Sequence, residues 1–288
     1  MFKKIVKHKI GAHLSSKGTP LNIFTEAKNL EIKVAACFTS PRLQYGIERN
    51  VSHETSEKFK EICRKENFET FSHGCYVINI ADSQKETNYK NSLAAVVQEL
   101  KRCESLGMIG AVIHPGSNPN KKLGLETVAN SIEEIFFNFY PKKTSLLIET
   151  SAGQGNTMPV SMEDATFIRK KLSKATRKKC KIVLDTCHLH SAGYNLSKYK
   201  DVVNFLDLVS TEIGFENIAL IHLNDSKYPC GSKKDRHANI GNGTISLEGI
   251  AAFLNDEKIK RIPKILETPV SHYLEWKKDF AVLEKILE

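Results

Sequence analysis

The sequence predicts an α/β fold in which eight parallel strands alternate with eight helices and close into a single (β/α)8 TIM barrel. The length of 288 residues suits one such barrel, which commonly occupies ~250 residues as one domain. Short apolar segments rich in β-branched residues recur between longer segments of helical period, as expected for parallel strands covered by helices. Each short segment turns polar at its end, where a barrel strand opens into the loops at its mouth. We therefore expect residues 1–288 to form one domain.

The predicted strands are apolar segments with polar ends, taken here in chain order. The first four are HKIGAHLS near 8–15, VAACFT at 34–39, TFSHGCYV at 70–77 and GAVIHPG at 110–116. The last four are SLLIET at 145–150, KIVLDTCH at 181–188, IALIHLND at 218–225 and IPKILET at 262–268. An open doubly wound sheet is the alternative, but the glycine fingerprint that it would place after its first strand is absent.

Segments of helical period fill the gaps between these strands. They cover residues 20–30, 54–66, 86–107, 122–139, 161–175, 197–213, 246–255 and 273–287. The run RKKLSKATRKKCK at 169–181 is either a nuclear-localisation patch or the solvated face of a helix that leads into the sixth strand, and we favour the helix face.

Composition and cysteine usage indicate an ordinary soluble protein. Hydrophobic residues make up 41% and charged residues 26%, which argues against disorder and against a fibrous design. No apolar run approaches the ~18 residues of a membrane helix, and the start MFKKIVKHKIGAH does not resemble a signal peptide. The seven cysteines form no CxxC pair, which favours reduced thiols. We expect an intracellular protein of the cytoplasm or nucleus, neither secreted nor bound to a membrane.

A net charge of +9 favours polyanionic partners, because lysine and arginine displace condensed counterions from nucleic acid. Charge alone is a weak argument for such a partner.

Imidazole and carboxylate side chains gather at the ends of the predicted strands. Seven lie there or within a residue or two: His73, His114, Glu149, Asp185, His188, His222 and Glu267. The loop after the seventh strand adds Asp235 and His237, whose spacing puts both side chains on one side of an extended segment. Because the strand ends of a barrel converge, the sequence predicts a metal site at the C-terminal mouth.

These nine candidate ligands are too many for one zinc ion, which takes about four. They suit at least two metals if some carboxylates bridge. The mixture of imidazole and carboxylate favours zinc, with manganese or iron as substitutes, whereas magnesium and calcium prefer oxygen ligands alone. Divalent cations would also over-neutralise the carboxylates, which otherwise repel a phosphate.

Seven strings make the chain resemble the endonuclease IV family of apurinic/apyrimidinic (AP) endonucleases over nearly its whole length. They are IGAHLS, HPGS, ETSAGQG, VLDTCHLHSAGY, HLNDSK, DRHANIG and ILETP. The resemblance implies a zinc-dependent deoxyribonuclease IV of base excision repair. Such an enzyme hydrolyses the phosphodiester 5′ to abasic sites in double-stranded DNA and leaves a 3′-hydroxyl and a 5′-deoxyribose phosphate. It also implies removal of blocked 3′ ends by phosphodiesterase and phosphatase action. We expect a monomer, which no sequence feature tests.

The resemblance further implies three zinc ions per chain, with Mn²⁺ as a substitute. His73, His114 and Glu149 would hold the first zinc, and Glu149 would bridge to a second zinc bound by Asp185, His222 and Glu267. His188, Asp235 and His237 would hold the third. A zinc-bound hydroxide between the first two would be the nucleophile, which makes Glu149 the central catalytic position.

Four residues are candidate DNA contacts. Tyr76 matches a family position that is inserted into DNA at the lesion, and Val77 replaces a commoner leucine beside it. Arg42 is the candidate minor-groove contact, although its place in CFTSPRLQY is displaced relative to some members. Lys227 and Arg236 adjoin ligand motifs and are candidate phosphate contacts.

Other interpretations of these residues remain. A single histidine is more often structural than metal-bound, and His13 and Cys187 lie at the mouth without matching family ligand positions. A sugar isomerase or epimerase would share the fold and the strand-end ligands, but it would have no use for Asp235, His237 or a positive net charge. A DNA-binding protein without catalysis would be expected to lose ligands.

Overall fold

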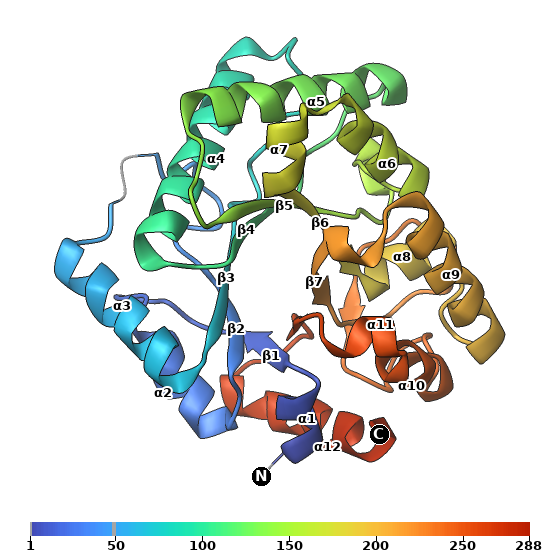
Figure 1. The fold of residues 1–288 in the computed structure, drawn as a ribbon. Helices are drawn as coiled ribbons and strands as arrows, with labels where there is room; N and C mark the ends of the chain where they lie inside the picture. The colour runs from blue at the N-terminus through green and yellow to red at the C-terminus, as the bar shows by residue number, and fades with distance from the viewer. Residues whose placement is uncertain (1, 48–49) are drawn as a thin grey trace.

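Eight parallel strands form a closed barrel in the computed structural model, which describes residues 2–47 and 50–288 (Figure 1). The strands are β1 Ile10–His13, β2 Val34–Phe38, β3 Glu69–His73, β4 Gly110–Ile113, β5 Ser145–Glu149, β6 Cys180–Asp185, β7 Ile218–His222 and β10 Lys264–Leu266. Each strand pairs with the next one along the chain, and β1 closes the barrel against β10. The predicted fold class is confirmed.

Helices surround the barrel, and each predicted helical segment contains one (Figure 1). The main helices are α2 Asn22–Leu30, α3 His53–Glu66, α4 Glu86–Leu106, α5 Lys121–Asn138, α6 Met162–Lys171, α9 Tyr199–Glu212, α10 Leu247–Asn255 and α12 Trp276–Ile286. Short elements join them: α1 Lys3–Lys7, α7 Lys174–Lys179, α8 Thr186–Ala192, α11 Glu257–Lys260, η1 Gln154–Asn156, η2 Phe215–Asn217 and η3 Tyr273–Glu275. Two further strands, β8 Asp225–Ser226 and β9 His237–Ala238, pair antiparallel above the barrel.

Side-chain caps define several helix starts. Ser52 accepts a hydrogen bond from the backbone N–H of Thr55 at the start of α3, and Asn120 accepts one from Leu123 at the start of α5. These bonds satisfy amide groups that have no partner within the helix.

Apolar side chains fill two layers. One cluster occupies the barrel interior with side chains from seven of the eight strands: Val34, Ala36, Phe71, Val112, Leu147, Val183, Leu220 and Ile265. The larger cluster lies between the strands and the helices, because alternate strand residues face opposite sides of the sheet. The interior is therefore packed, and polar groups can gather only at its two ends.

Several predicted boundaries were wrong. The strand predicted at 181–188 ends at Asp185, and the next residues form α8 because the Asp185 carboxylate accepts a hydrogen bond from the N–H of His188 at 2.7 Å and caps that helix. The strands predicted at 8–15, 70–77, 110–116, 218–225 and 262–268 are likewise shorter than expected. Single backbone hydrogen bonds continue just past these strand ends, such as Leu14 N–H to the Ala36 carbonyl and Leu223 N–H to the Ile265 carbonyl, both at 2.8 Å, before the chain turns into loops.

The helix predicted at 161–175 is also interrupted. Helix α6 ends at Lys171, Leu172 is extended and buried, and Ser173 caps the separate helix α7. The basic run at 169–181 is therefore folded into the end of α6, helix α7 and the start of β6. None of the described helices combines the length and the apolar character needed to cross a membrane.

Candidate metal centre

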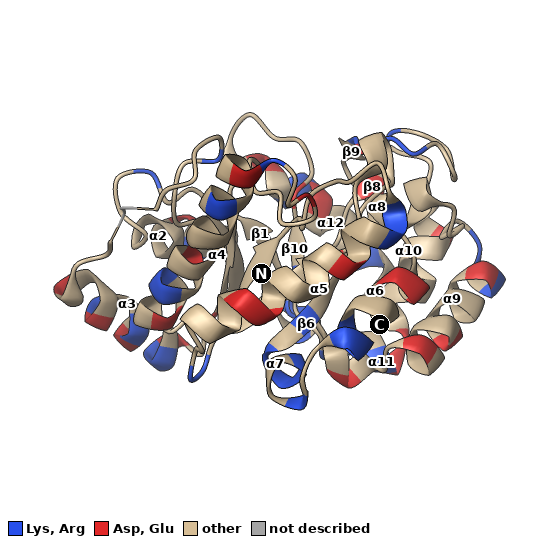
Figure 2. Cartoon of the chain, turned by 90° about the horizontal axis from the view of Figure 1, so that it is seen from above, with Lys and Arg blue, Asp and Glu red and all other residues tan. Residues whose placement is uncertain are grey.

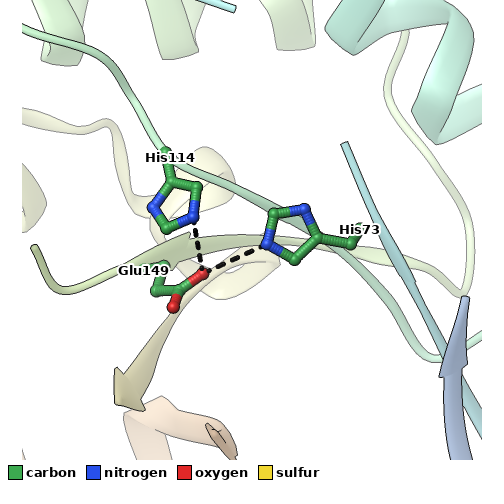
Figure 3. Close-up of side chains that lie close together, drawn as sticks. All are labelled: His73, His114 and Glu149. Atoms are coloured by element: carbon green, nitrogen blue, oxygen red, sulfur yellow. Dashed lines mark ion pairs between the residues drawn. The ribbon is translucent and has the colours of Figure 1, made fainter. Parts of the chain in front are cut away.

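Two histidines meet one carboxylate at the carboxyl ends of β3, β4 and β5. The Nε2 atoms of His73 and His114 lie 3.4 and 3.5 Å from the same Glu149 oxygen, Oε2 (Figure 3). His73 ends β3, His114 directly follows β4 and Glu149 ends β5. Glu149 is fully buried, so this carboxylate has no access to bulk water.

The other oxygen of Glu149 faces a second group. Its Oε1 lies 2.9 Å from Nδ1 of His222, which is also 3.3 Å from Oε2 of Glu267. Asp185 completes this group, because one ligand atom from each of the four residues lies within 4.8 Å of the others. Glu149 thus stands between the first and second groups, as a bridging ligand would.

The third group joins α8 to the β8–β9 segment. Oδ1 of Asp235 lies 3.2 Å from Nε2 of His188 and 3.6 Å from Nε2 of His237. Nε2 of His237 also lies 3.6 Å from Oδ2 of Asp185. Asp185 therefore approaches two groups, a proximity that the strand-end pattern does not predict. Cys187 Sγ is also within 4.8 Å of ligand atoms of Asp235 and His237.

Several atoms at the centre are buried without a hydrogen-bond partner among the described residues. They include Glu149 Oε2, His188 Nε2, His222 Nε2 and His237 Nε2. An unsatisfied buried polar atom costs about 1–3 kcal/mol. A bound group that interacts with several of these atoms would remove this cost. Imidazole nitrogens and carboxylate oxygens form the donor set that zinc accepts, and the residues fit a metal cluster.

Hydrogen bonds outside the centre orient three of the imidazoles. Nδ1 of His73 bonds to the Gly74 carbonyl at 2.8 Å, and Nδ1 of His188 bonds to the Thr150 carbonyl at 2.8 Å. Nδ1 of His237 lies 3.2 Å from the carbonyl oxygen of Glu267. Because a carbonyl can only accept, each Nδ1 carries the proton and each Nε2 keeps its lone pair toward the centre.

Two carboxylates are held in a similar way. Asn224 Nδ2 donates to Asp185 Oδ2 at 2.7 Å, and Nδ1 of His13 lies 3.0 Å from Glu267 Oε1. Such partners orient metal ligands in many proteins. Sequence reasoning missed Asn224, although it lies within the string HLNDSK. It placed His13 at the mouth without deciding between contact with a ligand and a purely structural role, and the structure brings this histidine to Glu267.

The buried carboxylates of the centre are stabilised in their charged form by nearby positive charge. Burial opposes ionisation of Glu149, yet the nearby His114 and His222 outweigh it and hold its pKa well below the usual range. Burial lowers the pKa of His222, but Glu149 and Glu267 raise it to about 9 overall. Burial raises the pKa of Asp235, but His188, whose Nε2 lies 3.2 Å from the Asp235 carboxylate, and His237 outweigh burial and lower this pKa to about 2. Protons or metal cations can supply this positive charge.

A cavity of about 550 Å³ opens beside the three groups, and its lining includes Tyr76, Asn79 and Gln154 together with the ligand candidates. Its size lies within the usual range for small-molecule sites. Tyr76 is 52% exposed, and its ring centroid lies 5.5 Å from that of His73. This tyrosine therefore forms part of the cavity rim.

The candidate DNA contacts lie on loops at this mouth. Arg42 is exposed, and its carbonyl accepts a hydrogen bond from the Tyr76 N–H at 2.8 Å. Lys227 and Arg236 are exposed in the β8–β9 segment, where the Lys227 N–H donates to the Arg236 carbonyl at 3.0 Å. The structure thus pairs the four residues two by two, through their backbones.

A buried ion pair holds the loop that carries Arg42. Arg102 and Glu99, both on α4, contact each other and are 2% and 1% exposed. Arg102 also donates to Thr39 Oγ1 and to the Gly46 carbonyl, both at 2.8 Å. Thr39 in turn donates to Glu99 at 2.7 Å. The loop between Thr39 and Gly46 is therefore anchored at both ends by one helix.

Comparison with known proteins gives the family. A family model described as a xylose isomerase-like TIM barrel matches residues 24–286. A probable endonuclease 4 of Persephonella marina is 36% identical, and the match covers 91% of both chains. A probable endonuclease 4 of Aquifex aeolicus is 33% identical over 90% of this chain and 91% of that protein. The chain belongs to the endonuclease IV family.

Solved structures agree with this membership. Endonuclease IV from Thermus thermophilus superposes with a TM-score of 0.84 at 25% identity, covering 96% of this chain and 99% of that one. A D-tagatose 3-epimerase-like protein reaches a TM-score of 0.71 at 17% identity, with 96% and 98% covered, which shows a shared fold only. The resemblance to the endonuclease IV family is confirmed, and the likeness to an epimerase does not favour the sugar-enzyme interpretation.

Proposed function

We propose that this member of the endonuclease IV family is a DNA-repair enzyme that hydrolyses the phosphodiester 5′ to abasic sites in double-stranded DNA. The convergence of nine imidazole and carboxylate side chains at one mouth is the observation that supports it most strongly. The relatives named endonuclease 4 support the same activity. The products would be a 3′-hydroxyl and a 5′-deoxyribose phosphate, and cleaning of blocked 3′ ends would be a side activity. We expect the 288 residues to act as one domain and as a monomer.

The proposed cofactor is a set of three zinc ions, with manganese as a substitute. The ligands would be His73, His114 and Glu149 for the first, Glu149, Asp185, His222 and Glu267 for the second, and His188, Asp235 and His237 for the third. When bound, the zinc ions would supply a hydroxide nucleophile at neutral pH and stabilise the charge that develops on the phosphate.

The side chains of the protein would organise this chemistry. Glu149 presents one oxygen to His73 and His114 and the other to His222, so it could serve as a ligand of both the first and the second cation. Backbone carbonyls keep His73 and His188 in the tautomer that leaves Nε2 available. Because these groups are ordered by bonds outside the centre, little reorganisation is needed during the reaction.

Recognition of the lesion would use the rim and the cavity. An abasic nucleotide has no base to pair or stack, so it leaves the helix at less cost than an intact nucleotide. The cavity of about 550 Å³ beside the ligands has room for the extruded sugar and phosphate. The exposed ring of Tyr76 would fill the gap left in the duplex, with Arg42 placed nearby by its backbone bond to Tyr76.

The test is incision of a labelled duplex that contains one tetrahydrofuran abasic analogue. The zinc-replete protein should cleave on the 5′ side and leave a 3′-hydroxyl, an outcome that excludes β-elimination. Glu149→Gln removes the central charge, and its turnover should fall by more than about 100-fold, since changes to outer partners of metal ligands alone cost about 10–100-fold.

Glu134→Gln is the matched control, because Glu134 is exposed on α5 and remote from the mouth. Its incision rate should equal that of the unmodified protein. Absence of cleavage by the zinc-replete protein would overturn the proposal and direct the search toward ketose and aldose substrates. Near-normal turnover of Glu149→Gln would reject the bridging role of Glu149.

A further inference from the structure

Nine basic side chains gather at the amino-terminal end of the barrel, opposite the metal centre. They are Lys142, Lys143, Lys170, Lys171, Lys174, Arg177, Lys178, Lys179 and Lys181, and we call them the α7 basic surface. They come from the loop before β5, the end of α6, helix α7 and the start of β6. Figure 2 shows helix α7 with its blue residues at the edge of the molecule opposite β8 and β9.

Contacts between these segments hold the surface together. Lys179 Nζ donates to the carbonyl of Lys142 at 2.7 Å. The Tyr140 hydroxyl donates to the carbonyl of Ala175 in helix α7 at 3.1 Å. Residues far apart in the sequence thus share one surface.

The basic side chains of this surface form no close ion pairs with the carboxylates that the structure describes. Among the described residues, none of its nine side chains has a carboxylate oxygen within 4.0 Å. Lysines elsewhere on the protein do form such pairs, as Lys33 does with Glu66 at 2.5 Å and Lys90 with Glu86 at 2.6 Å. The surface holds nine of the 42 lysine and arginine residues of the chain, whose net charge is +9.

The nearest carboxylates bind backbone and hydroxyl groups. Glu133 accepts from the Ser173 N–H at 2.5 Å and from the Thr176 hydroxyl at 2.8 Å. Glu104 accepts from the backbone N–H groups of Lys143 and Thr144 at 3.1 and 2.9 Å. These glutamates fix the shape of the segment, while the ammonium groups of Lys179 and Lys181 donate to the carbonyls of Lys142 and Glu216 at 2.7 and 3.0 Å. Like charges at this density repel one another over a Debye length of ~8 Å, and a polyanion would relieve that repulsion.

We propose that the α7 basic surface binds a second segment of duplex DNA, without sequence preference, while the metal face engages its target. The choice of DNA rests on the proposed function, because DNA is then the polyanion that surrounds the enzyme. Lysine is a flexible point charge that suits backbone phosphates without a fixed geometry, and eight of the nine side chains are lysines. Release of counterions from the phosphates supplies the affinity.

The bound segment must differ from the one at the metal face. Strand β6 alone has six residues, or ~20 Å at ~3.3 Å per residue, and loops and helices add to this at both ends. Duplex DNA has a persistence length of ~150 bp, so a short duplex cannot bend around the barrel. The enzyme would therefore bridge two segments and could pass from one to the other without release into solution.

The experiment compares two double variants that each lower the net charge from +9 to +7. Lys174→Gln/Lys178→Gln alters the α7 basic surface, and Lys28→Gln/Lys58→Gln alters exposed lysines on α2 and α3. Bead-bound undamaged 30-bp duplex captures a second, labelled 30-bp duplex through the protein. Losing two phosphate contacts should weaken bridging about 60-fold at 0.1 M salt, from a slope of ~0.9 per contact. The control should bridge as the unmodified protein does.

Lysine acetylation followed by mass spectrometry locates the contact directly. Undamaged duplex should protect Lys174 and Lys178 from acetylation but not Lys28 and Lys58. Equal bridging by both double variants, or protection by polyglutamate and not by duplex, would overturn the proposal, the latter in favour of an acidic protein partner.

Incision of a 30-bp abasic duplex separates this proposal from the proposed function. The α7 double variant should incise that duplex at the unmodified rate, since none of its altered residues lies at the metal face. Wild-type incision without bridging or protection would refute the α7 proposal alone. Protection without incision would refute the proposed function alone.

Discussion

Replacement of Arg102 by methionine should destabilise the fold and loosen the loop that presents Arg42. Methionine keeps much of the side-chain volume but loses the guanidinium. Glu99 would then remain as a buried carboxylate that is 1% exposed, with the Thr39 hydroxyl at 2.7 Å and the weakly donating Cys103 thiol at 3.9 Å as donors. Breaking a buried ion pair from one side costs about 3–5 kcal/mol, because the remaining charge has lost its counter-ion.

The double variant Glu99→Gln/Arg102→Met tests this reasoning. Glutamine at position 99 removes the stranded charge and can still accept from Thr39, so the double variant should recover a large part of the loss. Urea unfolding gives the free energies of unfolding. If Arg102→Met alone costs less than about 1 kcal/mol, or if the double variant is no more stable than Arg102→Met, the ion-pair argument is wrong.

The same variants report on the loop. Arg102 donates to Thr39 and Gly46 at the two ends of the loop that contains Arg42. This loop contains none of the candidate metal ligands. Steady-state incision of the abasic duplex should therefore show a larger rise in KM than fall in kcat for Arg102→Met. A fall in kcat alone would indicate damage to the metal centre and contradict the positioning role.

Two other predictions concern metal removal and pH. A free metal concentration about 1,000-fold above the Kd adds about 4 kcal/mol to the free energy of unfolding, so chelation should lower the Tm by several degrees. Metal analysis should find three zinc ions per chain. Equal Tm values before and after chelation would count against the cluster. Burial, with a smaller effect of Lys9, lowers the pKa of Lys264 to about 7, so the unfolded chain binds this proton more tightly and the free energy of unfolding should rise by about 1.4 kcal/mol per pH unit between pH 7 and 10.5. Urea unfolding gives the free energies of unfolding of the wild type and of Lys264→Met at pH 7.5 and 9.5. The difference between the two proteins should grow by about 2–3 kcal/mol in favour of the wild type at the higher pH. An unchanged difference would mean that the three carbonyls bonded to Lys264 Nζ keep the amine charged.

The sequence by itself predicted the barrel and the residues that meet at its mouth. The alternation of apolar strands with helical segments is a local pattern, and closure of a parallel barrel brings all strand ends together. Histidines and carboxylates at those ends, such as His73, Glu149 and Glu267, could therefore be placed near one another from the sequence alone. The one-sided placement of Asp235 and His237 followed from their spacing in the same way.

Only the tertiary structure decided how those residues are held. The pattern of KIVLDTCH is equally compatible with a longer strand, and α8 forms because Asp185 caps it. Asn224 and the carbonyl of Thr150 orient ligands from other segments of the chain. Glu99 and Arg102 have the i, i+3 spacing of a surface pair, yet packing against the loop after β2 buries them. Each of these contacts depends on the distance in space between segments that are far apart in the sequence. Local sequence patterns do not encode that distance, because it is set by closure of the barrel.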